Sequence, residues 1–232
     1  MKHAQPRGLS RRRVEELLSK TKSYRSAGDR IEVLSRFFLG LPYTINPLIG
    51  SAEKPEVFTA SLDGFDCVTY LETILALSRA STVDEFIDWL RRIRYERGQV
   101  KWERRNHYMT DWIRNNARSG AIRRVSPRDT RRVVKERILN AIPGLPPVRA
   151  RFAAVPKTEM PKLAPQLQTG DLVFFGSTRA HLDVFHVGLV IRGGDRLLLR
   201  HAARSKGGVV EQELDDFLKA NRMSGVIIAR PR

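Results

Sequence analysis

The segment Phe65-Asp66-Cys67-Val68-Thr69-Tyr70, residues 65–70, contains the only cysteine of the 232-residue chain. Apolar residues recur behind it at three- to four-residue spacing, which predicts a helix that ends near Arg79-Ala80. Cys67 falls in the first turn of this helix. The positive end of a helix dipole favours a thiolate over a thiol, so this position is typical of a cysteine nucleophile.

A single cysteine is more often a small, buried, apolar residue than a nucleophile. A second feature favours catalysis: the apolar run from Phe185 to Ile191 has the pattern of a strand and contains His186 near its start. Imidazole is the natural base for a thiol. We therefore interpret Cys67 together with His186.

A second histidine strand follows directly. Residues 197–202 form another short apolar run, which contains His201 near its end, and the turn Arg192-Gly193-Gly194-Asp195 connects the two runs. In an antiparallel hairpin the start of one strand lies beside the end of the next, so His186 and His201 can be neighbours. The sequence thus allows a relay of Cys67, His186 and His201.

These motifs resemble the NlpC-type papain-like cell-wall cysteine peptidases, and more closely their N-acetylmuramoyl-L-alanine amidase-like branch. The matching motifs agree in order from about Gly40 to the C-terminus: Asp66 to Thr73, His107 to Trp112, Leu182 to Gly188, His201-Ala202 and Gly225 to Pro231. Residues 1–25 are not covered. The resemblance implies an α+β, papain-like fold in which the nucleophile helix packs on an antiparallel sheet.

The resemblance also implies roles for single residues. Cys67 would be the nucleophile, His186 the base and His201 the group that orients the base. Tyr43, in a Pro-Tyr loop, would help the Cys67 backbone N–H to bind the oxyanion; a packed loop aromatic is the alternative.

Four further residues are weaker candidates for the oxyanion or substrate site. Asp66 adjoins the nucleophile, and His107 and Tyr108 lie in a block of basic, amide and aromatic groups that could recognise a sugar or a carboxylate. Asp183 could bind substrate, although closing the turn before the His186 strand is the favoured role.

The charge of the chain is strongly positive. There are 42 Lys and Arg against 25 Asp and Glu, a formal net charge of +17. Such a surface attracts polyanions. The arginines are scattered, however, and form no zinc finger, helix-turn-helix or aromatic-basic motif, so no specific nucleic-acid partner is predicted. An anionic cell envelope or a muropeptide with free carboxylates fits equally well.

No cofactor and no metal site are predicted, and one cysteine excludes an intrachain disulfide. The chain has no run of about 18 apolar residues, so no transmembrane segment is expected. The resemblance implies a bacterial protein, periplasmic if an export signal was removed and cytoplasmic otherwise. We expect a basic, partly disordered N-terminal segment at 1–25 and an amidase domain at 26–232.

Other elements are predicted from local patterns. Helices are expected at residues 10–20, 29–39, 82–97 and 108–117, with Thr82 and Glu85 as a capping box. Strands are expected at 170–175 and 225–229. Residues 130–142 fit a helix or a strand, and 143–165 form a long connection with one strand.

The predicted function is a cysteine amidase that hydrolyses muropeptides at the N-acetylmuramoyl-L-alanine bond. Three alternatives stay open. One is an endopeptidase that cuts the stem peptide after D-glutamate. The second is a zinc hydrolase that uses His186 and His201, although a third ligand and a His-Glu-x-x-His helix are missing. The third is a polyanion- or envelope-binding module on an inactive papain-like scaffold.

Overall fold

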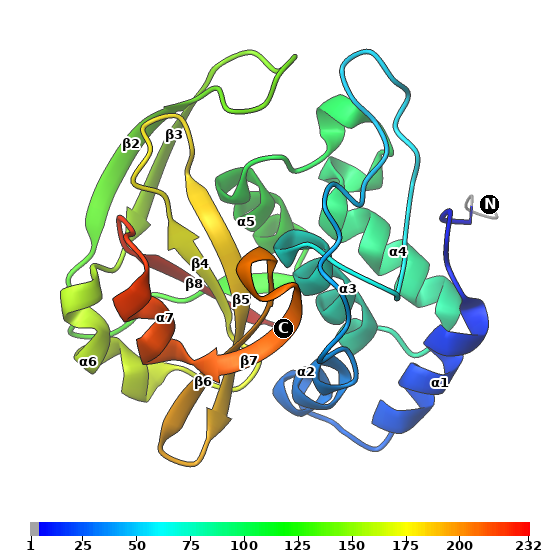
Figure 1. Ribbon diagram of the computed structural model, residues 1–232, viewed down its shortest axis with the longest axis horizontal. Helices are drawn as coiled ribbons and strands as arrows, with labels where there is room; N and C mark the ends of the chain where they lie inside the picture. Colours follow the sequence, from blue (N-terminus) through cyan, green and yellow to red (C-terminus); the bar gives the residue numbers. More distant parts are fainter. Residues whose placement is uncertain (1–4) are drawn as a thin grey trace.

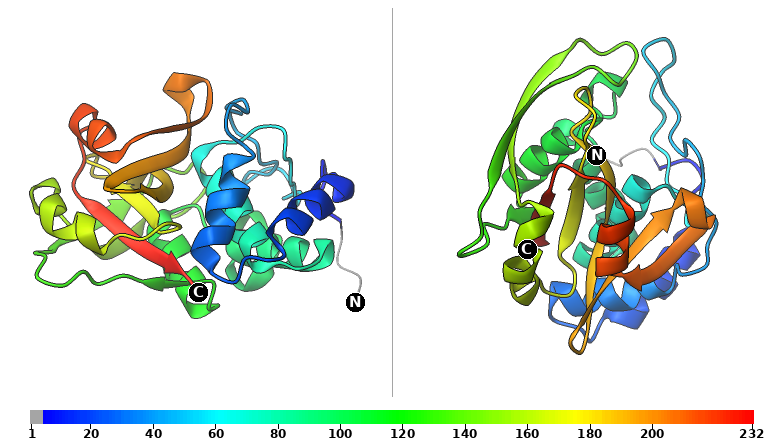
Figure 2. Two further views of the ribbon diagram at one scale, coloured as in Figure 1. Left: turned by 90° about the horizontal axis from the view of Figure 1, so that it is seen from below. Right: turned by 60° about the vertical axis from the view of Figure 1, so that its left-hand side comes forward.

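The computed structural model describes residues 5–232, and its helices lie on both sides of a central sheet (Figure 1). Helices α1 to α4 gather on one side of a six-stranded sheet, and both views in Figure 2 keep α1 and α2 apart from α6 and α7. The helices are α1 (Arg11–Thr21), α2 (Ala27–Arg36), α3 (Cys67–Arg79), α4 (Val83–Arg94), α5 (Met109–Arg118), α6 (Met160–Leu163) and α7 (Leu214–Ala220). None of the helices within residues 5–232 is long and apolar enough to span a membrane.

Helix α3 is the central element of the helical layer. It begins at Cys67, as predicted, because Asp66 caps it: the Asp66 carboxylate accepts from the Thr69 N–H at 2.7 Å and the Thr69 hydroxyl accepts from the Asp66 N–H at 3.1 Å. All residues from Thr69 to Ser78 are buried. The helix therefore packs against neighbours all round, with α2 and α4 beside it and strands β5 and β6 against it.

The sheet is antiparallel throughout, in the order β1-β8-β4-β5-β6-β7. The predicted histidine hairpin is confirmed: the turn Gly194-Asp195 connects its strands, and Gly193 pairs with Arg196. Gly194 has φ +65°, a conformation that suits glycine. The strands are β1 (Ile122–Arg124), β4 (Leu172–Gly176), β5 (Val184–Gly193), β6 (Arg196–Ala203), β7 (Gly208–Glu213) and β8 (Val226–Pro231).

Both faces of this sheet are buried, and strand β4 shows the alternation. Leu172 and Phe174 join the core beneath the helical layer, whereas Val173 and Phe175 join a second core with residues of α6 and α7. This explains why β4 is apolar at every position from Leu172 to Phe175 rather than alternating with polar residues. The mixed α+β class with an antiparallel sheet is confirmed.

Several local predictions are confirmed and others need correction. The helices predicted at 82–97 and 108–117 are present, but α4 ends at Arg94. The ambiguous segment 130–142 forms β2 (Val133–Leu139), which pairs with β3 (Val148–Ala154) in a separate two-stranded sheet. In the predicted capping box, the Thr82 hydroxyl accepts from the Glu85 N–H, but the Glu85 carboxylate accepts from the N–H of Ser81 rather than that of Thr82.

The N-terminal segment is part of the helical layer from α1 onward. Ser10 caps α1, and Val14, Leu17 and Leu18 are buried in the same core as α2, α3 and α4. The helix predicted at residues 10–20 is thus confirmed. Residues 1–4 of the predicted N-terminal segment lie outside the described residues.

Candidate active site

The candidate site lies where the start of α3 meets strand β5. The backbone N–H groups of Val187, Cys67 and Val68 lie close enough to the Cys67 sulfur to favour its thiolate. Val187 directly follows His186 in β5, and α3 packs on both β5 and β6. The fold therefore brings the start of the cysteine helix to the strand that contains His186.

The two histidines predicted as neighbours are in contact. His186 Nε2 lies 2.5 Å from His201 Nδ1, and the two rings are nearly perpendicular, at 83°. His201 is buried, with 2% of its surface exposed. The hairpin register thus holds the pair in one fixed arrangement.

The tautomers of the pair follow from the role of a base. If His186 keeps its proton on Nε2, it donates to His201 Nδ1, and its own Nδ1 is free to accept a proton. Among residues 5–232, His186 Nδ1 has no hydrogen-bond partner. His201 then carries its proton on Nε2, a buried atom that has no hydrogen-bond partner in the described chain.

Two phenylalanines hold the histidine pair, and sequence reasoning did not identify either as part of the site. The His186 ring stacks against Phe175 at 21° and against Phe217 at 29°, with ring centroids 6.1 Å and 5.4 Å away. Phe217 also meets the His201 ring edge to face at 82°. Phe217 lies in α7, a helix that the sequence pattern did not predict.

Burial sets the resting protonation of the site. It raises the pKa of the Cys67 thiol to about 12, with the Asp66 charge acting in the same direction, and outweighs the three backbone N–H groups. Burial also lowers the pKa of His186 to about 3, helped by His201, and that of His201 to about 4. In the substrate-free protein, burial therefore favours a thiol and a neutral imidazole, against the thiolate that the helix start is predicted to favour.

Tyr43 lies beside the nucleophile. It is partly buried, its backbone bridges to Phe65, and burial followed by the charges of Cys67 and Asp66 raises its pKa. A phenol that stays protonated can donate a hydrogen bond. Its predicted role at the oxyanion stays a prediction.

The other predicted site residues have partners inside the protein. The Asp66 carboxylate caps α3, His107 Nε2 lies 2.7 Å from the Trp102 carbonyl oxygen, and the buried Tyr108 hydroxyl accepts from Ile142 N–H at 3.3 Å. Asp183 is 1% exposed. Its carboxylate accepts from Val184 N–H and from both the N–H and hydroxyl of Thr110, so it caps α5 and the turn before β5. Contact of these four residues with substrate stays a prediction.

The described residues offer little to a metal ion. Between residues 5 and 232, no group of three His, Cys, Asp or Glu side chains is arranged to hold a metal. His186 and His201 each use one ring nitrogen for the contact between them, so that nitrogen is not available to a metal ion. The donor set therefore does not fit the zinc alternative.

The chain matches a known protein family. Residues 33–226 match the model of the AmiA-like, N-acetylmuramoyl-L-alanine amidase-like family. The chain belongs to this family. No curated protein matches the chain.

Solved structures resemble this AmiA-like protein in fold. A Legionella pneumophila protein superposes with TM-score 0.83 at 20% identity, covering 95% of this chain and 94% of its own. An N-acetylmuramoyl-L-alanine amidase from Bacteroides uniformis superposes with TM-score 0.79 at 24% identity, covering 89% of this chain and 99% of its own. A Bacteroides fragilis protein described as a candidate xylanase superposes with TM-score 0.70 at 24% identity, covering 84% of this chain and 98% of its own.

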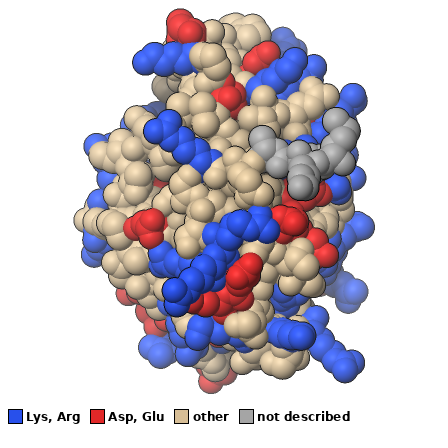
Figure 3. Space-filling view, turned by 90° about the vertical axis from the view of Figure 1, so that its right-hand side faces the viewer, with Lys and Arg blue, Asp and Glu red and all other residues tan. Residues whose placement is uncertain are grey.

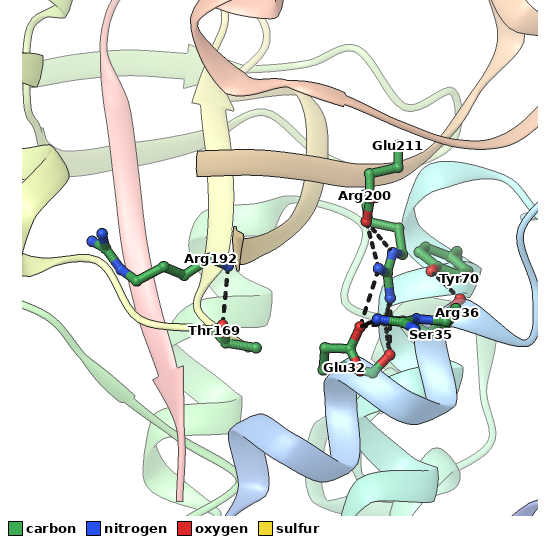
Figure 4. A network of polar contacts seen from close by, with 8 residues as sticks. All are labelled: Glu32, Ser35, Arg36, Tyr70, Thr169, Arg192, Arg200 and Glu211. Carbon is green, nitrogen blue, oxygen red and sulfur yellow. Dashed lines mark hydrogen bonds and ion pairs between the residues drawn. The ribbon is translucent and has the colours of Figure 1, made fainter. Parts of the chain in front are cut away.

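A polar network ties the histidine strand of this amidase-like protein to its helices (Figure 4). Arg200, next to His201 in β6 and only 2% exposed in its side chain, donates to the Glu211 carboxylate at 2.8 Å and to the Ser35 hydroxyl at 2.6 Å. The Tyr70 hydroxyl, three residues after Cys67, donates to the Ser35 carbonyl at 3.0 Å. Ser35 of α2 thus connects β6 to the nucleophile helix.

Replacing Arg200 with methionine is expected to lower the free energy of unfolding by about 2–3 kcal/mol, because it removes charge-assisted hydrogen bonds from a buried position. The loss stays below that of a fully buried pair since Glu211 and Glu32 are partly exposed. Urea unfolding measures it. Arg196→Gln, which breaks the more exposed pair with Glu213, is the matched control and should cost less than about 1 kcal/mol. Equal losses in the two variants would contradict this account of the network.

The neutral histidine pair predicts a pH-dependent stability. Because the folded pKa values of His186 and His201 lie below about 6.5, the value in an unfolded chain, the unfolded chain binds more protons below that pH. Stability is therefore full above pH 6.5 and falls on acidification, by up to about 1.4 kcal/mol per pH unit for each histidine. Denaturant unfolding at pH 7.5 and 5.5 measures the fall. It should be smaller in a His201→Asn variant; an unchanged fall would contradict the buried neutral pair.

Proposed function

We propose that this AmiA-like protein is a cysteine-dependent amidase with an NlpC-type papain-like fold, which hydrolyses muropeptides at the N-acetylmuramoyl-L-alanine bond. The observation that carries the proposal is the His186–His201 contact of 2.5 Å on the strand whose next residue, Val187, lies at the Cys67 sulfur. A thiol at the start of α3, a base on the adjoining strand and a group that orients this base are the parts that acyl transfer through a covalent intermediate requires.

In the first step, His186 Nδ1 takes the thiol proton while the Cys67 sulfur attacks the amide carbonyl carbon. The transfer accompanies the attack because the resting site holds a thiol and a neutral imidazole. The tetrahedral oxyanion is bound by the Cys67 backbone N–H and by the Tyr43 hydroxyl. The carbon–nitrogen bond then breaks, and the imidazolium of His186 gives its proton to the departing amine.

In the second step, water attacks the thioester. His186 now takes a proton from that water, the carbon–sulfur bond breaks, and the imidazolium returns the proton to the sulfur, which restores the Cys67 thiol and the neutral imidazole. His201 accepts the His186 Nε2–H throughout, so the base keeps one tautomer and one orientation. Phe175 and Phe217 restrict the tilt of the imidazole because they stack on its ring.

The bond cleaved is proposed from the family and from the amidase of Bacteroides uniformis with a similar fold. Hydrolysis of that bond releases a glycan with a free lactyl carboxylate and a peptide that begins with L-alanine. The endopeptidase alternative releases a muramoyl dipeptide and a shorter peptide. The two reactions therefore give products of different mass.

Incubation with a defined muropeptide, followed by mass spectrometry, tests the proposal. We expect a free glycan and an intact stem peptide that begins with L-alanine. A control without protein corrects for spontaneous hydrolysis. Muramoyl dipeptide among the products would establish the endopeptidase alternative, and binding of polyanions without any turnover would support the inactive scaffold.

A further inference from the structure

The corner between β6 and β7 is fixed beside the Tyr43 loop. It contains the short helix η5 (Arg204–Lys206), which begins three residues after His201. Tyr43 N–H donates to the Gly207 carbonyl at 2.8 Å, and Val209 N–H donates to the Leu41 carbonyl at 2.8 Å. A Cβ on Gly208 would lie 2.5 Å from the Leu41 carbonyl oxygen, so the two segments approach as closely as glycine allows.

Two cations on this corner are exposed and unpaired. Neither Arg204 nor Lys206 forms an ion pair with any carboxylate of residues 5–232. The other two cations of the β6–β7 segment are paired: Arg196 lies 3.0 Å from Glu213, and Arg200 binds Glu211. The corner is thus the only part of residues 196–213 with free positive charge.

The corner belongs to the rim of the candidate site, because Tyr43 connects the two: its N–H donates to the Gly207 carbonyl at 2.8 Å, and its backbone bridges to Phe65, two residues before Cys67. The charges act in line with this placement, since Cys67 and Asp66 raise the pKa of Tyr43 after burial does and Arg204 lowers it. On the face formed by α1 and α4, Lys and Arg side chains lie beside Asp and Glu (Figure 3), and Arg11 pairs with Asp84 at 2.9 Å.

We propose that Arg204 and Lys206 form a carboxylate-binding corner that selects stem peptides with a free α-carboxylate on their second residue. The proposal rests on the proposed function. In a muropeptide the lactyl carboxyl is part of the bond to be cut, so the nearest ionised group is the α-carboxylate of D-glutamate, which continues the chain through its γ-carboxyl. Arginine binds a carboxylate through two parallel N–H···O bonds, and a neighbouring lysine adds a point charge.

Two substrates that differ only in this group test the corner. One is a muramoyl tripeptide with D-glutamate, the other the same compound with D-isoglutamine, in which an amide replaces the α-carboxylate. We expect the Arg204→Gln/Lys206→Gln variant to lower kcat/KM for the D-glutamate compound by about 10- to 100-fold, mainly through KM, since charge-assisted hydrogen bonds to substrate are lost. Turnover of the D-isoglutamine compound should change less than about twofold.

Arg196→Gln is the matched control, an exposed arginine on the same strand pair whose charge is already paired. It should leave both substrates unaffected, and Arg204→Lys should keep part of the preference. Equal losses of kcat/KM on both substrates in the double variant would overturn the proposed corner, as would no loss on either substrate.

If the wild-type protein cuts neither compound, the proposed function fails. Calorimetric titration of both compounds onto the wild-type protein then tests the corner alone, and equal affinities for the two compounds would overturn the corner.

Discussion

Replacing Cys67 with alanine should lower kcat by at least about 10⁴-fold, because the thiol is the group that forms the covalent intermediate and no other residue can substitute for it. Cys67→Ser should be nearly as inactive, because a serine hydroxyl is less acidic than a thiol and the neutral imidazole of His186 is too weak a base to form its alkoxide. The measurement is release of glycan from a defined muropeptide at saturating substrate.

The control for the Cys67→Ala variant is a measurement of its stability, which shows whether the fold is intact. Cys67 is partly buried, and its side chain is small, so Cys67→Ala should change the free energy of unfolding by less than about 1.5 kcal/mol. Loss of turnover with an intact unfolding transition supports a chemical role. Turnover retained in the alanine variant would rule out the thiol mechanism.

Replacing His186 with alanine should lower kcat by about 10³- to 10⁴-fold, since the base that takes the thiol proton is removed while the oxyanion donors remain. The variant also leaves a space beside Phe175 and Phe217, which contact each other with ring centroids 4.4 Å apart. His186→Gln, which fills more of that space, separates lost packing from lost chemistry. Both variants should be inactive to a similar degree.

His181 is the matched control for His186. It lies five residues earlier in the chain and is exposed, and His181→Ala should change kcat less than about twofold. Comparing kcat for the two alanine variants at pH 7 decides between the histidines. Similar losses at His181 and His186 would contradict the assignment of the base.

The elements that hold the site were predictable because their signals are local. Asp66 and Thr69 mark the start of α3, and the apolar spacing behind Cys67 marks its length. The turn Gly194-Asp195 between two apolar runs sets the hairpin register, which in turn brings His186 to His201. Local caps and turns dictate these features whatever the rest of the chain does.

Other parts of the site depend on contacts between segments far apart in sequence. Phe217 reaches the histidine pair only because α7 folds back over the sheet, and its own segment of seven helical residues gives little periodic signal. Arg200 of β6 donates to the hydroxyl of Ser35 in α2, which lies 165 residues earlier in the chain. The resting protonation of Cys67 is also non-local, because burial by the whole fold outweighs the dipole of one helix.

The central claim is that Cys67 forms a thioester with the muramoyl group, and turnover in the presence of hydroxylamine tests it most directly. Hydroxylamine competes with water for a thioester, so a fraction of the released glycan should carry a hydroxamate in place of the lactyl carboxylate. Product masses from wild-type protein and from Cys67→Ala, each with and without hydroxylamine, give the result. We expect muramoyl hydroxamate and an intact peptide beginning with L-alanine from the wild type alone; a hydroxamate of muramoyl dipeptide, or turnover that yields only the free acid at every hydroxylamine concentration, would contradict the account.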